Sequence, residues 1–139
     1  MTYLLDTNVI SEVRKKIPDE GVKNWLENQP SIVQHISVIS LGELHQGANR
    51  VKPLEQRAKL ENWLEKLEQR FVSRILPLDN AVMRVWAEVT SNAMSQGQTP
   101  PHMDSLIAAT AIHHGLILVT RNTRDVKALG VKVFNPWDS

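Results

Sequence analysis

Four carboxylates in this sequence stand at positions from which they could act together. Asp6 directly follows a short apolar run, and Asp125 lies in the first helical turn expected after a second apolar run at 116–120. Glu43 and Asp104 lie in the first turns of two other expected helices. Converging carboxylates repel one another, and such a cluster is typical of a site for a hard divalent cation that prefers oxygen ligands. A cation held in this way can activate water and stabilise the charge that develops in phosphoryl transfer.

Each acid also has a purely structural explanation. The segment Ser40–Glu43 fits a capping box, in which the glutamate accepts hydrogen bonds from backbone N–H groups. Asp104 and Asp125 are first-turn acids of the kind that the helix dipole favours, and Asp6 could form a turn or an N-cap. Asp79 precedes another expected helix and is predicted to be only its N-cap. The shared position of the four acids, and not any one of them, supports a joint site.

The elements that must position these acids alternate between strand and helix. Strands are expected at 3–5, 32–39, 116–120 and 131–134, with a further strand or edge segment at 72–78. Helices are expected at 9–13, 19–28, 40–47, 54–71, 79–95, 102–114 and 122–129. This order predicts an α/β fold with a mostly parallel central sheet of about five strands, flanked by helices on both faces. Ligands of such sheets bind outside the carboxyl ends of the strands, which is where the acids are expected.

Composition narrows the classes of protein without indicating a chemistry. The 139 residues predict one domain, 1–139, and the absence of cysteine excludes disulfides, a thiolate nucleophile and thiolate metal sites. The formal net charge of +1 is far from the strongly basic balance of many nucleic-acid binders. No apolar run approaches the length of a membrane span, and no secretory signal opens the chain. We therefore expect a cytoplasmic protein without a membrane partner.

Four segments carry a family resemblance. They read LLDTNVIS at 4–11, SVISLGEL at 37–44, HMDSLIAA at 102–109 and LVTRNTRD at 118–125. In order and spacing they resemble the four motifs of the PIN-domain ribonucleases, and most of all the VapC-like and FitB-like toxins of type II toxin–antitoxin pairs. The resemblance extends from residue 3 to about Trp137 and implies the PIN-domain fold.

The resemblance also implies a role for each acid. Asp6 and Asp104 match the two aspartates that hold Mg²⁺, with Mn²⁺ as the alternative ion, while Glu43 matches the third acid and Asp125 the fourth. The polar neighbours that orient the carboxylates or their waters would be Thr7, Asn8, Ser40 and Thr120. The implied reaction is metal-dependent hydrolysis of RNA phosphodiester bonds. The implied partners are the RNA substrate, a cognate antitoxin whose tail blocks the acidic site, and a second copy of the chain in a homodimer. A larger toxin–antitoxin assembly would bind operator DNA through the antitoxin.

Other residues carry weaker predictions. Arg121 and Arg124 flank the fourth motif and either contact RNA phosphates or lie on a solvated face. The basic cluster at 14–16 either steers RNA, pairs with an acidic antitoxin segment or is solvated. The helix at 54–71 is expected to contribute to an antitoxin groove. Three tryptophans on apolar helix faces are interpreted as packing residues and not as RNA stacking platforms: Trp25, Trp63 and Trp86.

Two alternatives to the nuclease remain open. A catalytically silent PIN module would bind RNA or a protein partner, but the complete set of four acids argues against it. A different α/β phosphotransfer domain fits less well, because a receiver domain needs an acid beside Asp6 and an Asp-x-Asp phosphatase needs an aspartate where Asn8 stands. The sequence also contains no P-loop.

Overall fold

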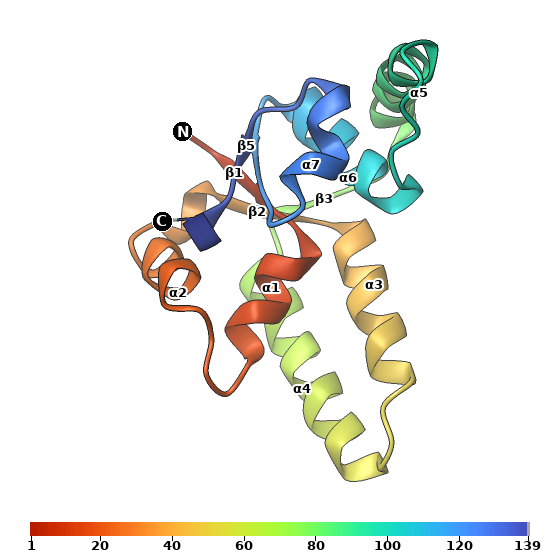
Figure 1. Ribbon diagram of the computed structural model, residues 1–139. Helices are drawn as coiled ribbons and strands as arrows, with labels where there is room; N and C mark the ends of the chain where they lie inside the picture. The colour runs from red at the N-terminus through yellow and green to blue at the C-terminus, as the bar shows by residue number, and fades with distance from the viewer. Residues whose placement is uncertain (139) are drawn as a thin grey trace.

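The computed structural model describes residues 1–138 and contains a five-stranded sheet with the order β3-β2-β1-β4-β5 (Figure 1). The pairings within this sheet are all parallel. Parallel neighbours require crossover connections, which the helices between the strands provide. The strands are short and span β1 (Tyr3–Leu5), β2 (Gln34–Ser37), β3 (Ile75–Leu76), β4 (Ile117–Val119) and β5 (Val133–Phe134). The predicted α/β fold is therefore confirmed.

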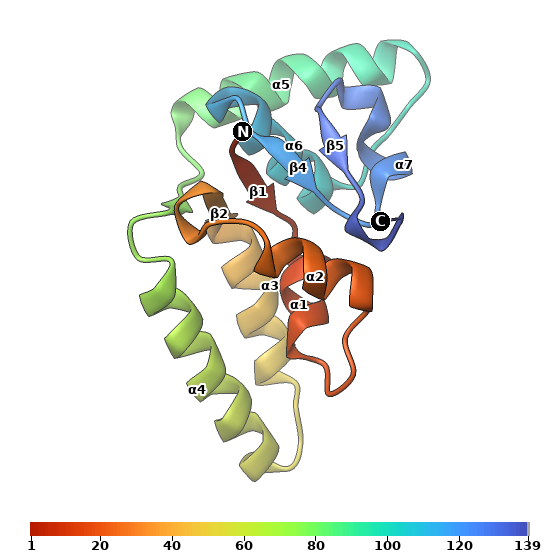
Figure 2. The same ribbon diagram turned by 90° about the vertical axis from the view of Figure 1, so that its left-hand side faces the viewer.

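Helices cover both faces of the sheet, and alternating side chains of the strands define two parts of the core. Leu4 and Leu118 pack on one face, whereas Leu5 and Val119 pack on the other. Figure 2 shows α5 along the side of the sheet that lies away from α1 and α2. The helices are α1 (Thr7–Arg14), α2 (Glu20–Glu27), α3 (Val38–Asn49), α4 (Leu54–Arg70), α5 (Asn80–Ser95), α6 (His102–His114) and α7 (Thr123–Val126). Short 3₁₀ turns lie at Ser31–Val33, Lys127–Leu129 and Pro136–Asp138.

The boundary between β2 and α3 differs from the prediction. The expected strand at 32–39 is shorter, and Val38 and Ile39 already belong to the helix. The N-cap is Ser37, whose Oγ accepts a hydrogen bond from the Ile39 N–H at 3.0 Å. The predicted capping box at Ser40–Glu43 is therefore wrong. Burial of Ile39 in the core outweighs the preference of β-branched residues for strands, because such propensities are weak compared with packing.

Other element ends agree with their sequence signals or are shorter than expected. Asp79 is the predicted N-cap, since its carboxylate accepts a hydrogen bond from the Val82 N–H at 3.0 Å. Gly115 ends α6 with a φ of +66°, a conformation that favours glycine. Gly47 does not end α3, which continues to Asn49. The expected strands at 72–78 and 131–134 shrink to β3 and β5, of two residues each.

The three tryptophans named above lie within packed regions. The Trp25 ring contacts Tyr3 and Phe134, with ring centroids 4.9 and 5.0 Å away. The indole N–H of Trp86 donates a hydrogen bond to the Ser105 hydroxyl at 2.9 Å. These contacts support their interpretation as packing residues. No helix within residues 1–138 combines the length and the apolar character that a membrane span requires.

Candidate active site

A cleft of about 410 Å³ lies at the carboxyl edge of the sheet, where β1 and β4 end side by side. Three of the predicted acids line it, and each comes from a different element: Asp6 follows β1, Glu43 lies on α3 and Asp104 lies in the first turn of α6. The topology therefore brings together three side chains that are up to about a hundred positions apart in sequence.

Asp6 is held rigidly at the floor of this cleft. Its side chain is buried, with the residue only 6% exposed, and its backbone N–H continues the sheet by donating to the Val119 carbonyl at 2.9 Å. One carboxylate oxygen accepts the Thr7 N–H at 2.7 Å, and the other accepts the Thr120 hydroxyl at 2.6 Å. Burial raises the pKa of Asp6, and the charge of Glu43 adds to this rise, while the bonds from Thr120 and Thr7 oppose it.

Glu43 is fixed by a hydroxyl pair that joins α1 to α3. The Thr7 hydroxyl lies 2.7 Å from the Glu43 carboxylate and 2.9 Å from the hydroxyl of Ser40, which is fully buried. Because a hydroxyl donates one proton and accepts others, Thr7 can serve both partners at once. Glu43 is thus directed toward the cleft by side-chain contacts and does not cap its own helix.

Asp104 shows how strongly these carboxylates influence one another. Partial burial raises its pKa to about 6, and the charges of Asp6, Asp125 and Glu43 contribute to the rise in that order. Asp125 itself is exposed on α7 and does not line the cleft, so its charge reaches Asp104 from the edge of the site. The structure therefore joins three of the predicted acids in the cleft and places the fourth beside it.

The remaining predicted polar residue, Asn8, extends the network around Thr120. The Asn8 amide donates to the Thr120 hydroxyl at 3.3 Å and accepts the Arg121 N–H at a long 3.5 Å. The Asn122 N–H also donates to Thr120, at 3.0 Å. Arg121 lines the cleft as a result, whereas Arg124 is exposed on α7 and does not line it.

Several residues that line the cleft were not predicted to belong to the site, and Glu12 and Trp137 are the most informative of them. Glu12 is buried, pairs with Lys15 at 2.8 Å and accepts the Asp19 N–H at 2.9 Å; the bond from Lys15, then the one from Asp19, lowers its pKa. Trp137 lies 5.2 Å from the Arg121 guanidinium, measured to the ring centroid. Trp137 could have been found from the sequence, since it lies shortly after the last strand, at the edge of the sheet where Asp6 follows the first.

The acids of the cleft offer carboxylate oxygens, which are the ligands that Mg²⁺ prefers. Within residues 1–138, no lysine, arginine or histidine forms a salt bridge with Asp6, Glu43 or Asp104. Over the same residues, no three acidic or histidine side chains stand close enough together to enclose an ion as they are arranged. Asp6 instead faces Thr120, and Glu43 faces Thr7. The three carboxylates therefore fit a hard cation by their chemistry, and in this structure Asp6 and Glu43 are hydrogen-bonded to threonine hydroxyls.

Comparisons with known proteins agree with this geometry. The chain is 35% identical over 136 residues to VapC ribonuclease Y4jK of Sinorhizobium fredii, covering 97% of each chain. It is 40% identical over 139 residues to toxin FitB of Neisseria gonorrhoeae, covering 96% of this chain and 97% of that one. The solved structure of FitAB bound to the IR36 DNA fragment superposes with a TM-score of 0.93 at 35% identity, over 98% of this chain and 96% of that one. The PIN domain family model matches residues 3–131, and the chain therefore belongs to the PIN domain family.

Proposed function

We propose that this chain is the toxin of a type II toxin–antitoxin pair and acts in the cytoplasm as a Mg²⁺-dependent endoribonuclease. The observation that carries the proposal is the meeting of Asp6, Glu43 and Asp104 in one cleft, where burial and then repulsion by neighbouring carboxylates raise the pKa of Asp104 to about 6. An arrangement that costs free energy in the folded chain is typical of a site that binds a cation. Relatives that are called a ribonuclease and a toxin support the same function.

Within this function each side chain has a defined task. Asp6, Asp104 and Glu43 would hold the ion, and Asp125 would add negative charge from the edge. Bound Mg²⁺, or Mn²⁺ in its place, supplies Lewis acidity at the phosphodiester and lowers the pKa of a water molecule. Thr120 and the Thr7 N–H fix Asp6, while the Thr7 hydroxyl and Ser40 fix Glu43. Arg121 and Arg124 would contact phosphates of the RNA.

Metal titration and growth together test the proposal. Calorimetry should detect Mg²⁺ and Mn²⁺ binding to the parent chain, and Asp6→Asn or Asp104→Asn should abolish it. Expression of the parent should inhibit growth, whereas Asp6→Ala and Asp104→Ala should not. Asp79→Asn is the matched control, because asparagine can still cap α5. If neither ion binds the parent, the catalytically silent PIN module becomes the better description.

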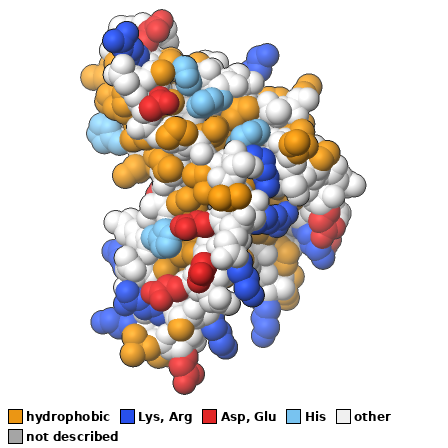
Figure 3. All heavy atoms as spheres, turned by 180° about the vertical axis from the view of Figure 1, so that it is seen from behind, with side chains coloured by type: hydrophobic (Ala, Val, Ile, Leu, Met, Phe, Trp, Pro, Cys, Tyr) orange, Lys and Arg blue, Asp and Glu red, His pale blue; other side chains and the backbone are white. Residues whose placement is uncertain are grey.

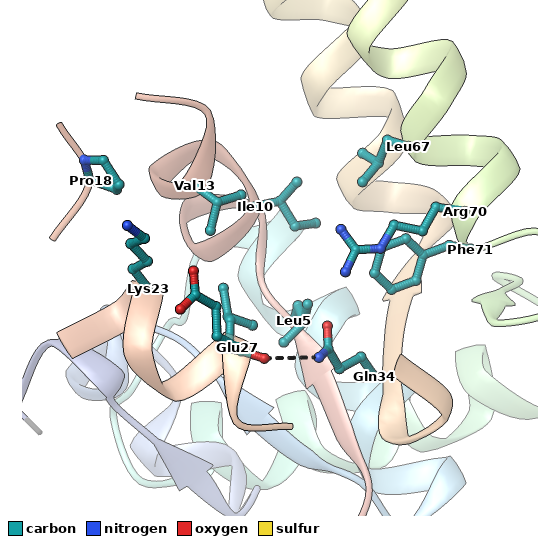
Figure 4. A pocket seen from close by; sticks show the side chains of 11 residues that line it. Leu5, Ile10, Val13, Pro18, Lys23, Glu27, Gln34, Leu67, Arg70 and Phe71 are labelled. Carbon is teal, nitrogen blue, oxygen red and sulfur yellow. Dashed lines mark hydrogen bonds between the residues drawn. The ribbon is translucent and has the colours of Figure 1, made fainter. Parts of the chain in front are cut away.

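The antitoxin is proposed to dock on a second, more apolar pocket of about 280 Å³ between α1, α2 and α4. Figure 4 shows Ile10, Leu67 and Phe71 around this pocket, with Lys23 and Glu27 on α2. This position gives α4 the role expected of the helix at 54–71. From here an extended antitoxin tail can run to the acidic cleft, since α1 contributes residues to both. Operator DNA would be bound through the antitoxin, in keeping with this chain's net charge of only +1.

A homodimer is proposed to bury exposed hydrophobic side chains at or just before the starts of helices. Val38 is 39% exposed, Leu78 is 39% exposed and Met103 is 52% exposed. Figure 3 shows hydrophobic and histidine side chains gathered on the upper half of the rear face. Light scattering of the purified chain should give twice its 15.7 kDa mass if the proposal is correct.

A further inference from the structure

Arg121 and Trp137 form a wall of the cleft in which Trp137 has no assigned role and Arg121 has only that of a phosphate contact. β4 and β5 are parallel neighbours with Val119 opposite Phe134, so the residues that follow these strands meet at the same edge of the sheet. There the Arg121 guanidinium lies 5.2 Å from the centroid of the Trp137 ring, within the range of a cation–π contact. Both residues line the cleft that contains Asp6 and Asp104.

Trp137 is held in place by its surroundings, whereas the Arg121 side chain is exposed beside it. The half-buried Trp137 packs against the core cluster around Leu5 and Val119, and its backbone N–H donates to the Asn135 side chain at 2.9 Å. Arg121 follows Thr120, which is bonded to Asp6. Its side chain is exposed, and the negative charge of buried Glu12 acts on it from across the cleft. A flat cation beside a packed indole ring is therefore presented to the cleft.

We propose that Arg121 and Trp137 form a stacking platform for the base of an unpaired nucleotide next to the scissile phosphate. The inference rests on the proposed ribonuclease function and names a binding residue pair for it. Unpaired RNA bases stack on aromatic rings and on guanidinium planes, and a guanidinium supported by an indole presents such a plane. Its edge N–H groups remain available for a phosphate oxygen.

Lys15 provides a useful contrast on the same cleft. Its ammonium is paired with Glu12 at 2.8 Å, so much of its charge is already compensated. An ammonium group is also a compact point charge without a plane on which a base can stack. The platform therefore depends on the shape of Arg121 as well as on its charge, and this distinction can be measured.

RNA binding without cleavage tests the platform. All variants are made in an Asp104→Asn background, and fluorescence anisotropy measures their affinity for a ten-nucleotide oligoadenylate. Trp137→Leu should weaken binding about 5- to 10-fold, while Trp137→Phe should restore most of it, because a phenyl ring still stacks. Arg121→Lys should also weaken binding several-fold while leaving its salt dependence unchanged, since the charge is kept. Arg84→Lys, at an exposed arginine on α5 that does not line the cleft, is the matched control and should change neither.

Oligonucleotides with a single abasic position identify the stacked base. At one position the abasic RNA should bind the parent and the Trp137→Leu variant equally, because no base remains for the platform. If Trp137→Leu weakens binding equally for every abasic position, or Arg121→Lys has no effect, the pair is only a structural contact and the inference is wrong. If circular dichroism shows that Trp137→Leu does not fold, the RNA affinities of Arg121→Lys and Trp137→Phe decide whether the platform exists.

Failure of the platform differs from failure of the proposed function. If the chain without the Asp104→Asn change does not cleave RNA with Mg²⁺ or Mn²⁺, the ribonuclease proposal fails and the platform with it. If that chain cleaves RNA but the stacking variants bind like their parent, only the platform is overturned.

Discussion

Asp104→Asn should stabilise the metal-free protein at neutral pH while it abolishes activity. In the folded chain, burial and the charges of Asp6, Asp125 and Glu43 raise the pKa of Asp104 from 3.8 to about 6. Each pKa unit corresponds to about 1.4 kcal/mol, so the charged form could cost the folded state about 3 kcal/mol at most. Asp104 is only partly buried, and solvent screening reduces the expected gain to about 1–1.5 kcal/mol.

The pH dependence of this gain has a definite sign. Between pH 4 and 6, Asp104 is protonated in a larger fraction of folded molecules than of unfolded ones. The parent therefore becomes more stable as the pH falls through this interval. Asparagine does not titrate and lacks this contribution. The advantage of Asp104→Asn should therefore be complete at pH 7.5, smaller at pH 6 and almost absent near pH 4.

Urea denaturation in EDTA at these pH values measures the difference. Asp79→Asn is the control and should stay within about 0.5 kcal/mol of the parent, because the cap of α5 is preserved. Mg²⁺ at ten times its dissociation constant should then stabilise the parent by about 1.4 kcal/mol and leave Asp104→Asn unchanged. The reasoning is refuted if Asp104→Asn destabilises the metal-free protein at pH 7.5, or if its effect is the same at every pH.

Three further predictions concern the supporting contacts. Thr120→Val removes the 2.6 Å hydrogen bond to Asp6; it should destabilise the chain by about 1–3 kcal/mol and shift the pH profile of activity to higher pH. Thr120→Ser should keep the stability and the pH profile of the parent. A parent-like pH profile for Thr120→Val would contradict the role of this bond. Asp125→Asn should lower the pKa of Asp104, as measured by NMR, because it removes a nearby negative charge, and the variant should keep part of its activity. An unchanged pKa of Asp104 would place Asp125 outside the site. Leu67→Glu should abolish co-purification with the proposed antitoxin, whereas Leu54→Glu, on the same helix but outside the pocket, should not. Equal effects of the two variants would exclude the pocket as the docking site.

The positions of the acids were predictable because parallel strands end at a common edge and the residues that follow them must meet there. The sequence could not show how Glu43 is used, since Ser40–Glu43 satisfies a local capping pattern while the start of α3 is decided by burial of Ile39 against distant helices. Glu12 was missed for a related reason. Its partner Lys15 is local, but its burial depends on the packing of α1 beside α2, which no short pattern encodes.

The bond between Asp6 and Thr120 also bears on how the protein is made. The two residues are 114 positions apart, and the strands that precede them are neighbours in the sheet. A chain still emerging from the ribosome contains Asp6 early, but it lacks Thr120 and the whole of β4 until the residues between them have been synthesised. Asp6 cannot take its place in the cleft before then. The order of the strands thus delays assembly of the cleft in each new molecule until β4 has been made and has paired with β1.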